Sequence, residues 1–283
     1  MHVLVTGGSG KIGRAAMRAL KEAGHRPVNF DIQPSSEPGR YVSVDCGDFG
    51  AVMGAMAGID TVGGIPDAVV HLAGIPAPGR APDHRTFEFN TLSTYNVFSA
   101  CARLGVKRIV WASSETVLGL PFDTPPEFAP VDETHPSRPE WSYSLSKQLG
   151  ETMAVQFSRW DPQLSITSLR FSNVFEPGDY ERLPQIQADP GPRRFNLWSY
   201  IDARDAGQAC RLAVENAAPG HEAMIIAAAD SLIDLPSAEL MATYFPNVPL
   251  RELSGTQSLL SPAKAGRLIG FQAQHSWRNQ KVA

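Results

Sequence analysis

The stretch His2–Ala23 constrains the fold of this chain more than any other part of the sequence. It opens with a short run of branched apolar residues, which is typical of a strand, and continues with a glycine-rich turn. Apolar residues then recur at helical spacing from Ile12 to Leu20, and Gly24 follows as a candidate helix end. A strand, a glycine turn and a helix in this order predict the first unit of a nucleotide-binding α/β sheet.

The turn carries the pattern Gly8-x-Gly10-x-x-Gly13. Glycines at this spacing let the backbone turn tightly, let a pyrophosphate approach the main chain, and pack the helix onto the strand. The N–H groups and the positive dipole end of the helix then attract phosphates. An ordinary glycine-rich turn is the alternative interpretation. We expect a dinucleotide site whose contacts include Gly7, Gly10, Lys11, Ile12 and Gly13.

Asp31 supplies a carboxylate at the position where a dinucleotide site needs one. Asp31 ends a second apolar run and follows Gly13 by 18 residues, which is close to the separation at which an acid reaches the adenosine ribose hydroxyls. Its charge would repel a 2′-phosphate, so NAD is favoured over NADP. Nearby basic residues, Lys11, Arg26 and Arg40, weaken that preference. A solvated turn carboxylate is the alternative for Asp31.

Composition narrows the class of protein. The chain has 283 residues, a formal charge of −4 and 43% hydrophobic residues, enough for one large domain or a domain with a smaller lobe. Mild acidity without a Lys/Arg block argues against nucleic acid as a partner. No apolar run approaches the roughly 18 residues of a membrane span, and no signal peptide is seen. The widely spaced Cys46, Cys101 and Cys210 fit a reducing cytoplasm.

Further along, predicted strands alternate with predicted helices, which indicates βαβ units and a parallel sheet. We expect strands over 28–31, 41–45, 68–74, 108–112 and 224–228, and helices over 48–57, 86–103, 142–159, 206–216, 236–244 and 261–268. Ligands of such sheets bind outside the carboxyl ends of the strands. Asp45, which either meets the adenine edge or starts the next helix, falls on that edge with Asp31, Gly74 and Ser114. His71 is expected to be a core histidine.

A helical stretch holds the candidate catalytic residues Tyr143 and Lys147. Their spacing of four places both side chains on one face of the helix. The ordinary pKa of tyrosine, near 10, is too high for a good base, but a neighbouring ammonium and an oxidised nicotinamide would lower it. A hydroxyl at the preceding strand end, Ser114 or else Ser113, can orient the same substrate oxygen. A core tyrosine beside a surface lysine is the alternative interpretation.

Taken together, the chain resembles the extended short-chain dehydrogenases/reductases of the NAD-dependent epimerase/dehydratase type. The resemblance spans most of the chain in family order, and no metal site is part of it. The segments that carry it are Thr6–Gly13, Asp31, His71–Gly74, Asn90 with Thr94, Ser113-Ser114 with Val117 and Gly119, Tyr143 with Lys147, Arg170–Val174, and Tyr200–Asp202 with Asp205.

The resemblance implies a Rossmann-type, doubly wound parallel sheet of about seven strands with a small C-terminal substrate lobe. The nucleotide domain would comprise residues 1–170 and about 202–228, and the lobe about 171–201 and 229–283. Ser114, Tyr143 and Lys147 would be catalytic. Cofactor contacts would further include Asp45, Cys46, Leu72, Ala73, Gly74, Asn90, Tyr143, Lys147 and Ser172. Substrate contacts would come from Ser113, Ser114, Glu115, Asn173 and Trp198.

Departures from the family pattern point to a small substrate. Members that bind nucleotide sugars usually have an arginine two positions before the Tyr-Ile pair, where this chain has Trp198; Arg193 and Arg194 are out of register. We therefore expect a free sugar, a sugar acid or a similar polyol. Trp198 can be a sugar platform or part of the lobe core. Glu115 can be an extra acid/base, a ligand of substrate hydroxyls or a solvated loop carboxylate.

These observations predict an NAD-dependent oxidoreductase that moves a hydride between nicotinamide and a carbinol carbon of a small polyhydroxylated substrate. An epimerase or dehydratase that recycles its NAD is the same-fold alternative. A non-catalytic NAD(P)-sensing module is the alternative from another class, because fold does not decide function. The family also uses the helices over 86–103 and 142–159 for a four-helix dimer interface, so a homodimer is expected.

Overall fold

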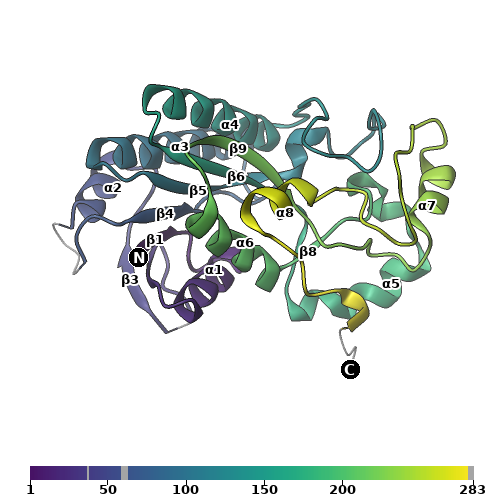
Figure 1. The fold of residues 1–283 in the computed structure, drawn as a ribbon, viewed down its shortest axis with the longest axis horizontal. Coiled ribbons are helices and arrows are strands. Elements are labelled where there is room, and N and C mark those ends of the chain that lie inside the picture. The colour runs from purple at the N-terminus through teal and green to yellow at the C-terminus, as the bar shows by residue number, and fades with distance from the viewer. Residues whose placement is uncertain (37, 59–62, 280–283) are drawn as a thin grey trace.

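The computed structural model describes residues 1–36, 38–58 and 63–279 and is built on a parallel sheet of seven strands (Figure 1). The strand order is β3-β2-β1-β4-β5-β6-β9. This doubly wound, Rossmann-type arrangement confirms the predicted fold class. The strands are β1 (His2–Thr6), β2 (Arg26–Asp31), β3 (Arg40–Ser43), β4 (Ala68–His71), β5 (Arg108–Ser114), β6 (Ser165–Phe171) and β9 (Gly220–Ile226).

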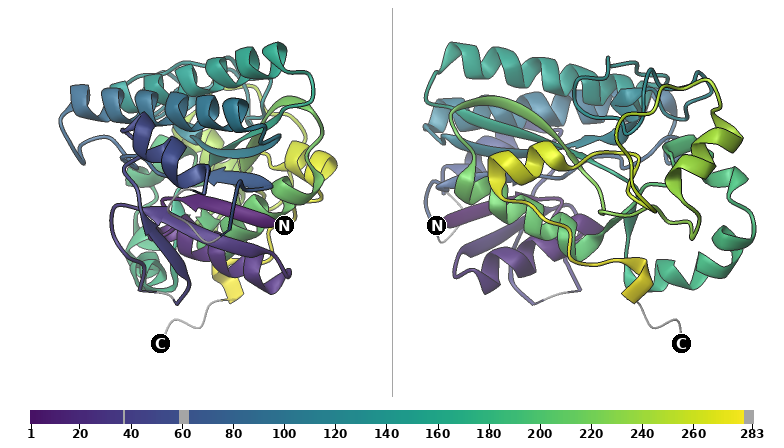
Figure 2. Two further views of the ribbon diagram at one scale, coloured as in Figure 1. Left: turned by 90° about the vertical axis from the view of Figure 1, so that its left-hand side faces the viewer. Right: turned by 45° about the vertical axis from the view of Figure 1, so that its right-hand side comes forward.

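Helices cover both faces of the sheet, as Figure 1 and the left view of Figure 2 show. One face packs against α2 (Phe49–Met56), α3 (Asp83–Leu104) and α4 (Ser142–Trp160). The other packs against α1 (Lys11–Glu22), α6 (Ala203–Asn216) and α8 (Ala263–Ile269). Within the described ranges, no helix combines the length and the apolar character that a membrane span requires.

Strand β6 was not among the strands expected from apolar runs. All seven of its residues are buried although four of them, Ser165, Thr167, Ser168 and Arg170, are polar. Two of these side chains have partners inside the protein: the Ser168 hydroxyl is 2.9 Å from Nε2 of His221 on β9, and the Arg170 guanidinium donates to the Glu151 carboxylate. Such internal pairing removes the usual cost of burying polar groups and also hides the strand from a reading based on hydrophobicity.

A second hydrophobic core lies beyond the carboxyl ends of the strands, around Tyr180, Trp198, Tyr200 and Leu240 (Figure 2, right). Its elements are β7 (Val174–Phe175), β8 (Ile201–Asp202), α5 (Leu183–Ala188), α7 (Ser237–Tyr244) and the 3-10 turns η2 (Pro177–Arg182) and η3 (Gly191–Asn196).

The two hydrophobic cores divide the chain differently from the predicted domains, as two examples show. Residues between Val117 and Val131, which were assigned to the nucleotide domain, contribute to the second core. Helix α8, which was assigned to the lobe, packs on the sheet through Ala265 and Ile269. The segment after α8 connects both parts: the N–H groups of Gln274 and His275 donate to the carboxylate of Asp205 on α6. The domain boundaries therefore stay a prediction.

Candidate active site

The glycine turn between β1 and α1 is shaped for a close approach of the main chain. Gly7 has φ +68°, and a Cβ at this position would lie 2.6 Å from the nitrogen of Ala73. A Cβ on Gly13 would lie 2.1 Å from the carbonyl oxygen of Gly7. Gly10 is the N-cap of α1 and supplies no side-chain acceptor to the N–H groups of the first turn. The turn therefore leads into a helix start that suits a phosphate. Lys11 and Ile12 are the first two residues of this helix.

The carboxylate of Asp31 lies at this turn, at the end of β2. One oxygen accepts a hydrogen bond of 3.1 Å from the backbone N–H of Ser9, and the other accepts one of 3.1 Å from that of Gln33. Lys11, in contrast, forms an ion pair of 2.5 Å with Asp179 of η2, away from Asp31. Asp31 and the glycine turn are thus together, as a ribose contact next to a pyrophosphate site requires.

Asp45 and Cys46 follow β3 on the same edge. The exposed Asp45 carboxylate accepts a hydrogen bond of 2.8 Å from the Gly47 N–H, so it shapes the turn before α2, while Asp48 is the helix N-cap. Cys46 is buried, and its carbonyl oxygen accepts a hydrogen bond of 3.0 Å from Asn96. An adenine contact from either residue stays a prediction.

The loop that follows β4 is held by two side chains. The Thr6 hydroxyl oxygen accepts hydrogen bonds of 3.2 Å from the N–H groups of both Leu72 and Ala73. Asn90 on α3 accepts a hydrogen bond of 2.7 Å from the Ile75 N–H and donates one of 3.1 Å to the Ile75 carbonyl. A Cβ on Gly74 would come within 3.2 Å of the Asn90 amide oxygen. Asn90 thus orders this loop.

His71 lies in the interior of the sheet, as expected of a core histidine. Its Nδ1 is 2.6 Å from the Thr6 hydroxyl, whereas its buried Nε2 has no partner among the described residues. Burial, aided by the charge of Lys147, lowers the pKa of His71 to about 3. The ring is therefore neutral at physiological pH and unsuited to act as a base.

Ser114, Tyr143 and Lys147 come together at the carboxyl edge of the sheet, and all three are buried. Ser114 ends β5, and its hydroxyl acts to lower the pKa of Tyr143 in the first turn of α4. One helical turn later, the Lys147 Nζ lies 5.7 Å from the centroid of the Tyr143 ring and donates a hydrogen bond of 2.7 Å to the Ala112 carbonyl. Their arrangement brings a phenol, a hydroxyl and an ammonium to one place.

The ionisation of this group differs from the expectation that a neighbouring ammonium lowers the pKa of the tyrosine. Burial raises the pKa of Tyr143 to about 12; the Ser114 hydrogen bond opposes this rise and the charge of Glu115 adds to it. Burial also lowers the pKa of Lys147 to about 8. In the polypeptide alone, the cost of burying a phenolate thus outweighs the help of its neighbours.

Glu115 is not a solvated loop carboxylate. One of its oxygens accepts a hydrogen bond of 2.6 Å from the Ser172 hydroxyl, and the other accepts one of 3.2 Å from the Asn196 amide. Burial raises the pKa of Glu115 to about 7. Both oxygens thus already accept hydrogen bonds from protein donors, and a role of Glu115 as a substrate ligand stays a prediction. The Ser172 hydroxyl points toward Glu115, because it donates its hydrogen bond to that carboxylate.

Two further residues predicted to contact substrate, Ser113 and Trp198, have partners inside the protein. The Ser113 hydroxyl donates a hydrogen bond of 2.6 Å to Glu151, which is also paired with Arg170 at 2.7 Å in the interior. Trp198 is fully buried in the second core, where its ring packs against Tyr244 and its indole N–H donates to a carbonyl oxygen. Substrate contacts from these two side chains stay predictions.

Arg193 and Asn196, which come from η3 in the second part of the structure, reach the site unexpectedly. The Arg193 guanidinium donates a hydrogen bond of 3.0 Å to the side-chain oxygen of the exposed Asn173, just after β6. It packs near the rings of Phe175 and Phe195, 5.5 and 5.3 Å from their centroids. Sequence spacing gave no signal for these contacts, because they join distant parts of the chain. Arg194 is exposed.

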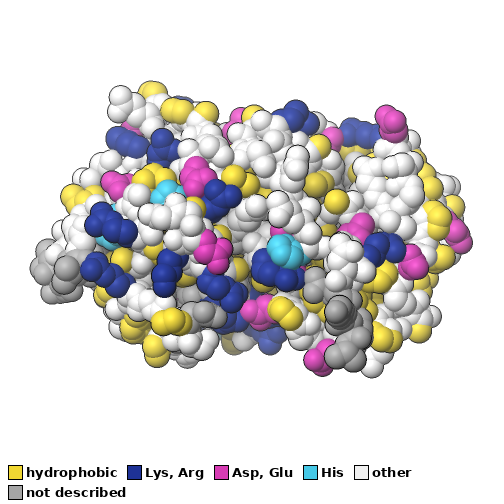
Figure 3. Space-filling model, turned by 60° about the horizontal axis from the view of Figure 1, so that its bottom comes forward, with side chains coloured by type: hydrophobic (Ala, Val, Ile, Leu, Met, Phe, Trp, Pro, Cys, Tyr) yellow, Lys and Arg dark blue, Asp and Glu magenta, His cyan; other side chains and the backbone are white. Residues whose placement is uncertain are grey.

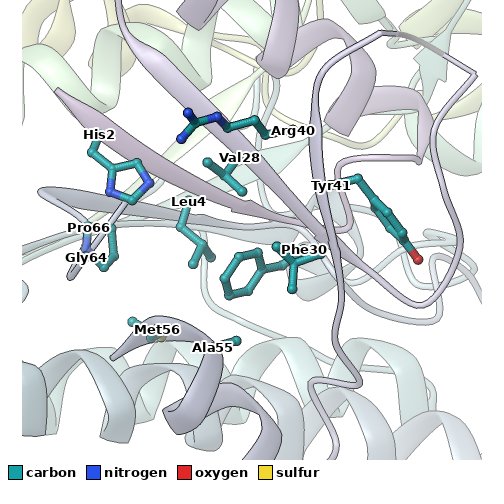
Figure 4. A pocket seen from close by; sticks show the side chains of 11 residues that line it. His2, Leu4, Val28, Phe30, Arg40, Tyr41, Ala55, Met56, Gly64 and Pro66 are labelled. Carbon is teal, nitrogen blue, oxygen red and sulfur yellow. The ribbon is translucent and has the colours of Figure 1, made fainter. Parts of the chain in front are cut away.

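Two cavities lie away from the catalytic residues. One, of about 350 Å³, is lined mainly by apolar side chains of β1, β2, β3 and α2, with His2 and Arg40 among its lining residues (Figure 4). The other, of about 860 Å³, lies along α1 and α6 on the face seen in Figure 3. Its Arg14, Arg204 and Arg211 form ion pairs with acidic residues, so their charge is compensated. Neither cavity has Ser114, Tyr143 or Lys147 among its lining residues.

Comparison with known proteins agrees with this geometry. The model of a family described as the NAD dependent epimerase/dehydratase family matches residues 3–227. UDP-glucose 4-epimerase 3 of Oryza sativa subsp. japonica is 31% identical over 224 residues, which cover 73% of this chain and 57% of that protein. The L-arabinose 1-dehydrogenase (NAD(P)(+)) of Haloferax volcanii is 27% identical over 230 residues, which cover 77% of this chain and 84% of that protein.

Among solved structures, a short-chain dehydrogenase/reductase superfamily protein from Agrobacterium tumefaciens with bound NAD superimposes with a TM-score of 0.74. It is 24% identical and the match covers 99% of this chain and 94% of that chain, so the likeness is one of fold. The epimerases that this chain matches in sequence are longer: the match spans between 52% and 65% of their length.

Proposed function

Because the chain belongs to the NAD dependent epimerase/dehydratase family, we propose that it is an NAD-dependent oxidoreductase acting on a small polyhydroxylated substrate. It moves a hydride between nicotinamide and a carbon that is a carbinol in one direction and a carbonyl in the other. The observation that carries this proposal is the convergence of Ser114, Tyr143 and Lys147 at the carboxyl edge of the sheet. Sites at that edge are the rule for open α/β folds.

The residues present fit NAD. The turn at Gly7 and Gly13 is a cradle that a Cβ would fill, and α1 begins there without a side-chain cap. Asp31 supplies a carboxylate for the ribose hydroxyls and repels a 2′-phosphate, which favours NAD over NADP. Leu72, Ala73 and Gly74 line the next strand end. When bound, NAD supplies a hydride acceptor at its nicotinamide ring and, in its oxidised form, a positive charge.

The chain's own residues handle the proton. As the phenolate, Tyr143 accepts the proton of the substrate hydroxyl while the hydride leaves the carbon, and in the reverse direction it returns that proton. Ser114 donates a hydrogen bond to the same oxygen as negative charge develops on it. Lys147 balances the charge of the phenolate and keeps two N–H donors besides the one on Ala112 for the nicotinamide ribose.

Two observations support a substrate smaller than a nucleotide sugar. The position where the resemblance leads one to expect a diphosphate-binding arginine is Trp198, which is buried in the second core. The match also spans 84% of the L-arabinose 1-dehydrogenase but 57% of UDP-glucose 4-epimerase 3. A free sugar or sugar acid agrees with both. The family membership and the epimerase relatives favour one further candidate, an epimerase or dehydratase that recycles its NAD.

One experiment separates these activities. Purified protein is given NAD⁺ with a panel of free sugars, sugar acids and hydroxy acids, and the near-ultraviolet absorbance of NADH is followed together with the products. Steady accumulation of NADH supports the dehydrogenase. A change of product without accumulation supports the epimerase or dehydratase. Binding of NAD without any change in substrate would contradict an enzyme and leave a sensing module.

We further propose that the protein forms a homodimer and is located in the cytoplasm. Helices α3 and α4 expose large apolar side chains, Leu92, Tyr95, Leu145, Val155 and Trp160, which need a cover. A homodimer formed through these helices buries them. All three cysteines are buried free thiols, which agrees with a reducing compartment and hence with the cytoplasm.

A further inference from the structure

The hydroxyl oxygen of Ser114 accepts two hydrogen bonds from the same residue. Thr116 donates its backbone N–H at 3.2 Å and its side-chain hydroxyl at 3.0 Å. Both bonds arise because Ser114 is the N-cap of the 3-10 turn η1 (Glu115–Leu118), which begins directly after β5. Thr116 is half-buried.

A hydroxyl group has two acceptor lone pairs and one hydrogen to donate. Thr116 occupies both lone pairs of Ser114, so the only hydrogen-bonding capacity left to Ser114 is its own hydrogen. That hydrogen is available to the oxygen of Tyr143, and the Ser114 hydroxyl acts to lower the pKa of this phenol, which favours the phenolate.

From this geometry we propose that Thr116 is a positioning residue that makes Ser114 an obligate hydrogen-bond donor, whose one hydrogen goes to the Tyr143 oxygen or, when substrate is bound, to the substrate oxygen beside it. The inference rests on the proposed function and deepens it. A serine that is free to rotate can also accept the O–H of Tyr143 or of the substrate hydroxyl, which stabilises the neutral forms. A serine held by Thr116 stabilises the anionic forms, the phenolate and the oxyanion that develops in hydride transfer, more than the neutral ones, because an anion is the stronger acceptor.

Besides the Ser114 hydroxyl, the charged groups around Tyr143 affect its pKa. Among the described residues, Glu115 of η1 faces it and raises its pKa, and Lys147 lies over its ring from the same helix. Substituting Thr116 changes neither of these charges. An altered titration of Tyr143 in a Thr116 variant therefore reports on the direction of the Ser114 hydrogen bond.

The test compares Thr116→Val, which removes the hydroxyl at nearly constant shape, with Thr116→Ser, which keeps it. The protein is labelled with 3-fluorotyrosine, whose phenol ionises at lower pH than that of tyrosine, and Tyr143 is assigned in the fluorine NMR spectrum by its loss in Tyr143→Phe. We expect a higher pKa of the labelled Tyr143 in Thr116→Val and a wild-type value in Thr116→Ser. This readout requires neither NAD nor turnover.

Turnover gives a second readout. The loss of one neutral hydrogen bond predicts a kcat about three- to tenfold lower for Thr116→Val, with KM within about twofold of the wild type, and recovery in Thr116→Ser. If Thr116→Val does not fold, Thr116→Ala replaces it. An unchanged titration of Tyr143 in the variant that lacks the hydroxyl overturns the inference, whatever the turnover. A wild type that binds no NAD overturns the proposed function instead, and the titration still decides the inference.

Discussion

Asn196 donates a hydrogen bond of 3.2 Å to Glu115, and this contact joins the second core to the strand end that carries the catalytic serine. The other Glu115 oxygen is held by Ser172. A buried carboxyl with only uncharged donors bonded to it resists ionisation, which is why burial raises the pKa of Glu115 to about 7. The site thus contains an acid that titrates near neutrality for structural reasons.

The first prediction concerns stability against pH. The pKa of Glu115 is raised in the folded state, so protonated Glu115 contributes to the free energy of unfolding. This contribution is complete below about pH 4.5 and is lost as the pH rises to about 7. Glu115→Gln does not ionise, so the free energy of unfolding of the wild type should fall relative to the variant over that interval, by on the order of 3 kcal/mol. Urea unfolding from pH 4 to 8 measures it. Parallel curves would rule out this titration.

The second prediction concerns cofactor choice. Asp31→Asn removes the charge that repels a 2′-phosphate, so the ratio of kcat/KM for NAD to that for NADP should fall about tenfold or more. Asp45→Asn is the matched control, because that carboxylate is exposed and bonded to Gly47. A ratio that is unchanged in Asp31→Asn would remove Asp31 from the ribose site.

The third prediction uses two helical glycines. A Cβ at Gly150 of α4 would lie 2.3 Å from the ring of the buried Trp111, while Gly54 of α2 has open space. Gly150→Ala should therefore destabilise the protein by about 1–3 kcal/mol, whereas Gly54→Ala should stabilise it by up to about 1 kcal/mol. Since Lys147 lies over the Trp111 ring, Gly150→Ala should also reduce turnover. Equal effects of both substitutions on thermal unfolding would contradict this packing.

The fourth prediction tests the dimer. Leu92→Glu combined with Val155→Glu places charge on the exposed faces of α3 and α4, so the protein should sediment as a monomer. Leu268→Glu on α8 is the control, because Leu268 is as exposed as Leu92, 44% against 45%. Sedimentation velocity measures the mass of each variant. A double variant that remains dimeric would place the interface elsewhere.

The sequence predicts well what depends on local spacing. The glycine turn, the fold class and the shared helical face of Tyr143 and Lys147 follow from residues within a few turns of one another. Alternation along a strand could also have separated Ser113 from Ser114, since neighbours on β5 point to opposite faces and Ser114 faces Tyr143. That signal was present and was missed.

Other features depend on contacts between distant segments. Asn196 and Arg193 meet Glu115 and Asn173 only because the second core folds over the sheet, and Trp198 is buried by that same packing. No spacing rule relates these positions. Apolar spacing does not predict strand β6 for a related reason, since the side chains of Ser168 and Arg170 have partners on other elements.

The central claim is that Tyr143 moves the substrate proton beside a bound nicotinamide. Tyr143→Phe keeps the ring and removes the hydroxyl, so turnover of the best substrate should fall by at least about a hundredfold. The Kd of NAD, measured by calorimetry, should stay within about threefold of the wild-type value. Turnover of Tyr143→Phe at the wild-type rate, with NAD bound equally well, would contradict the account.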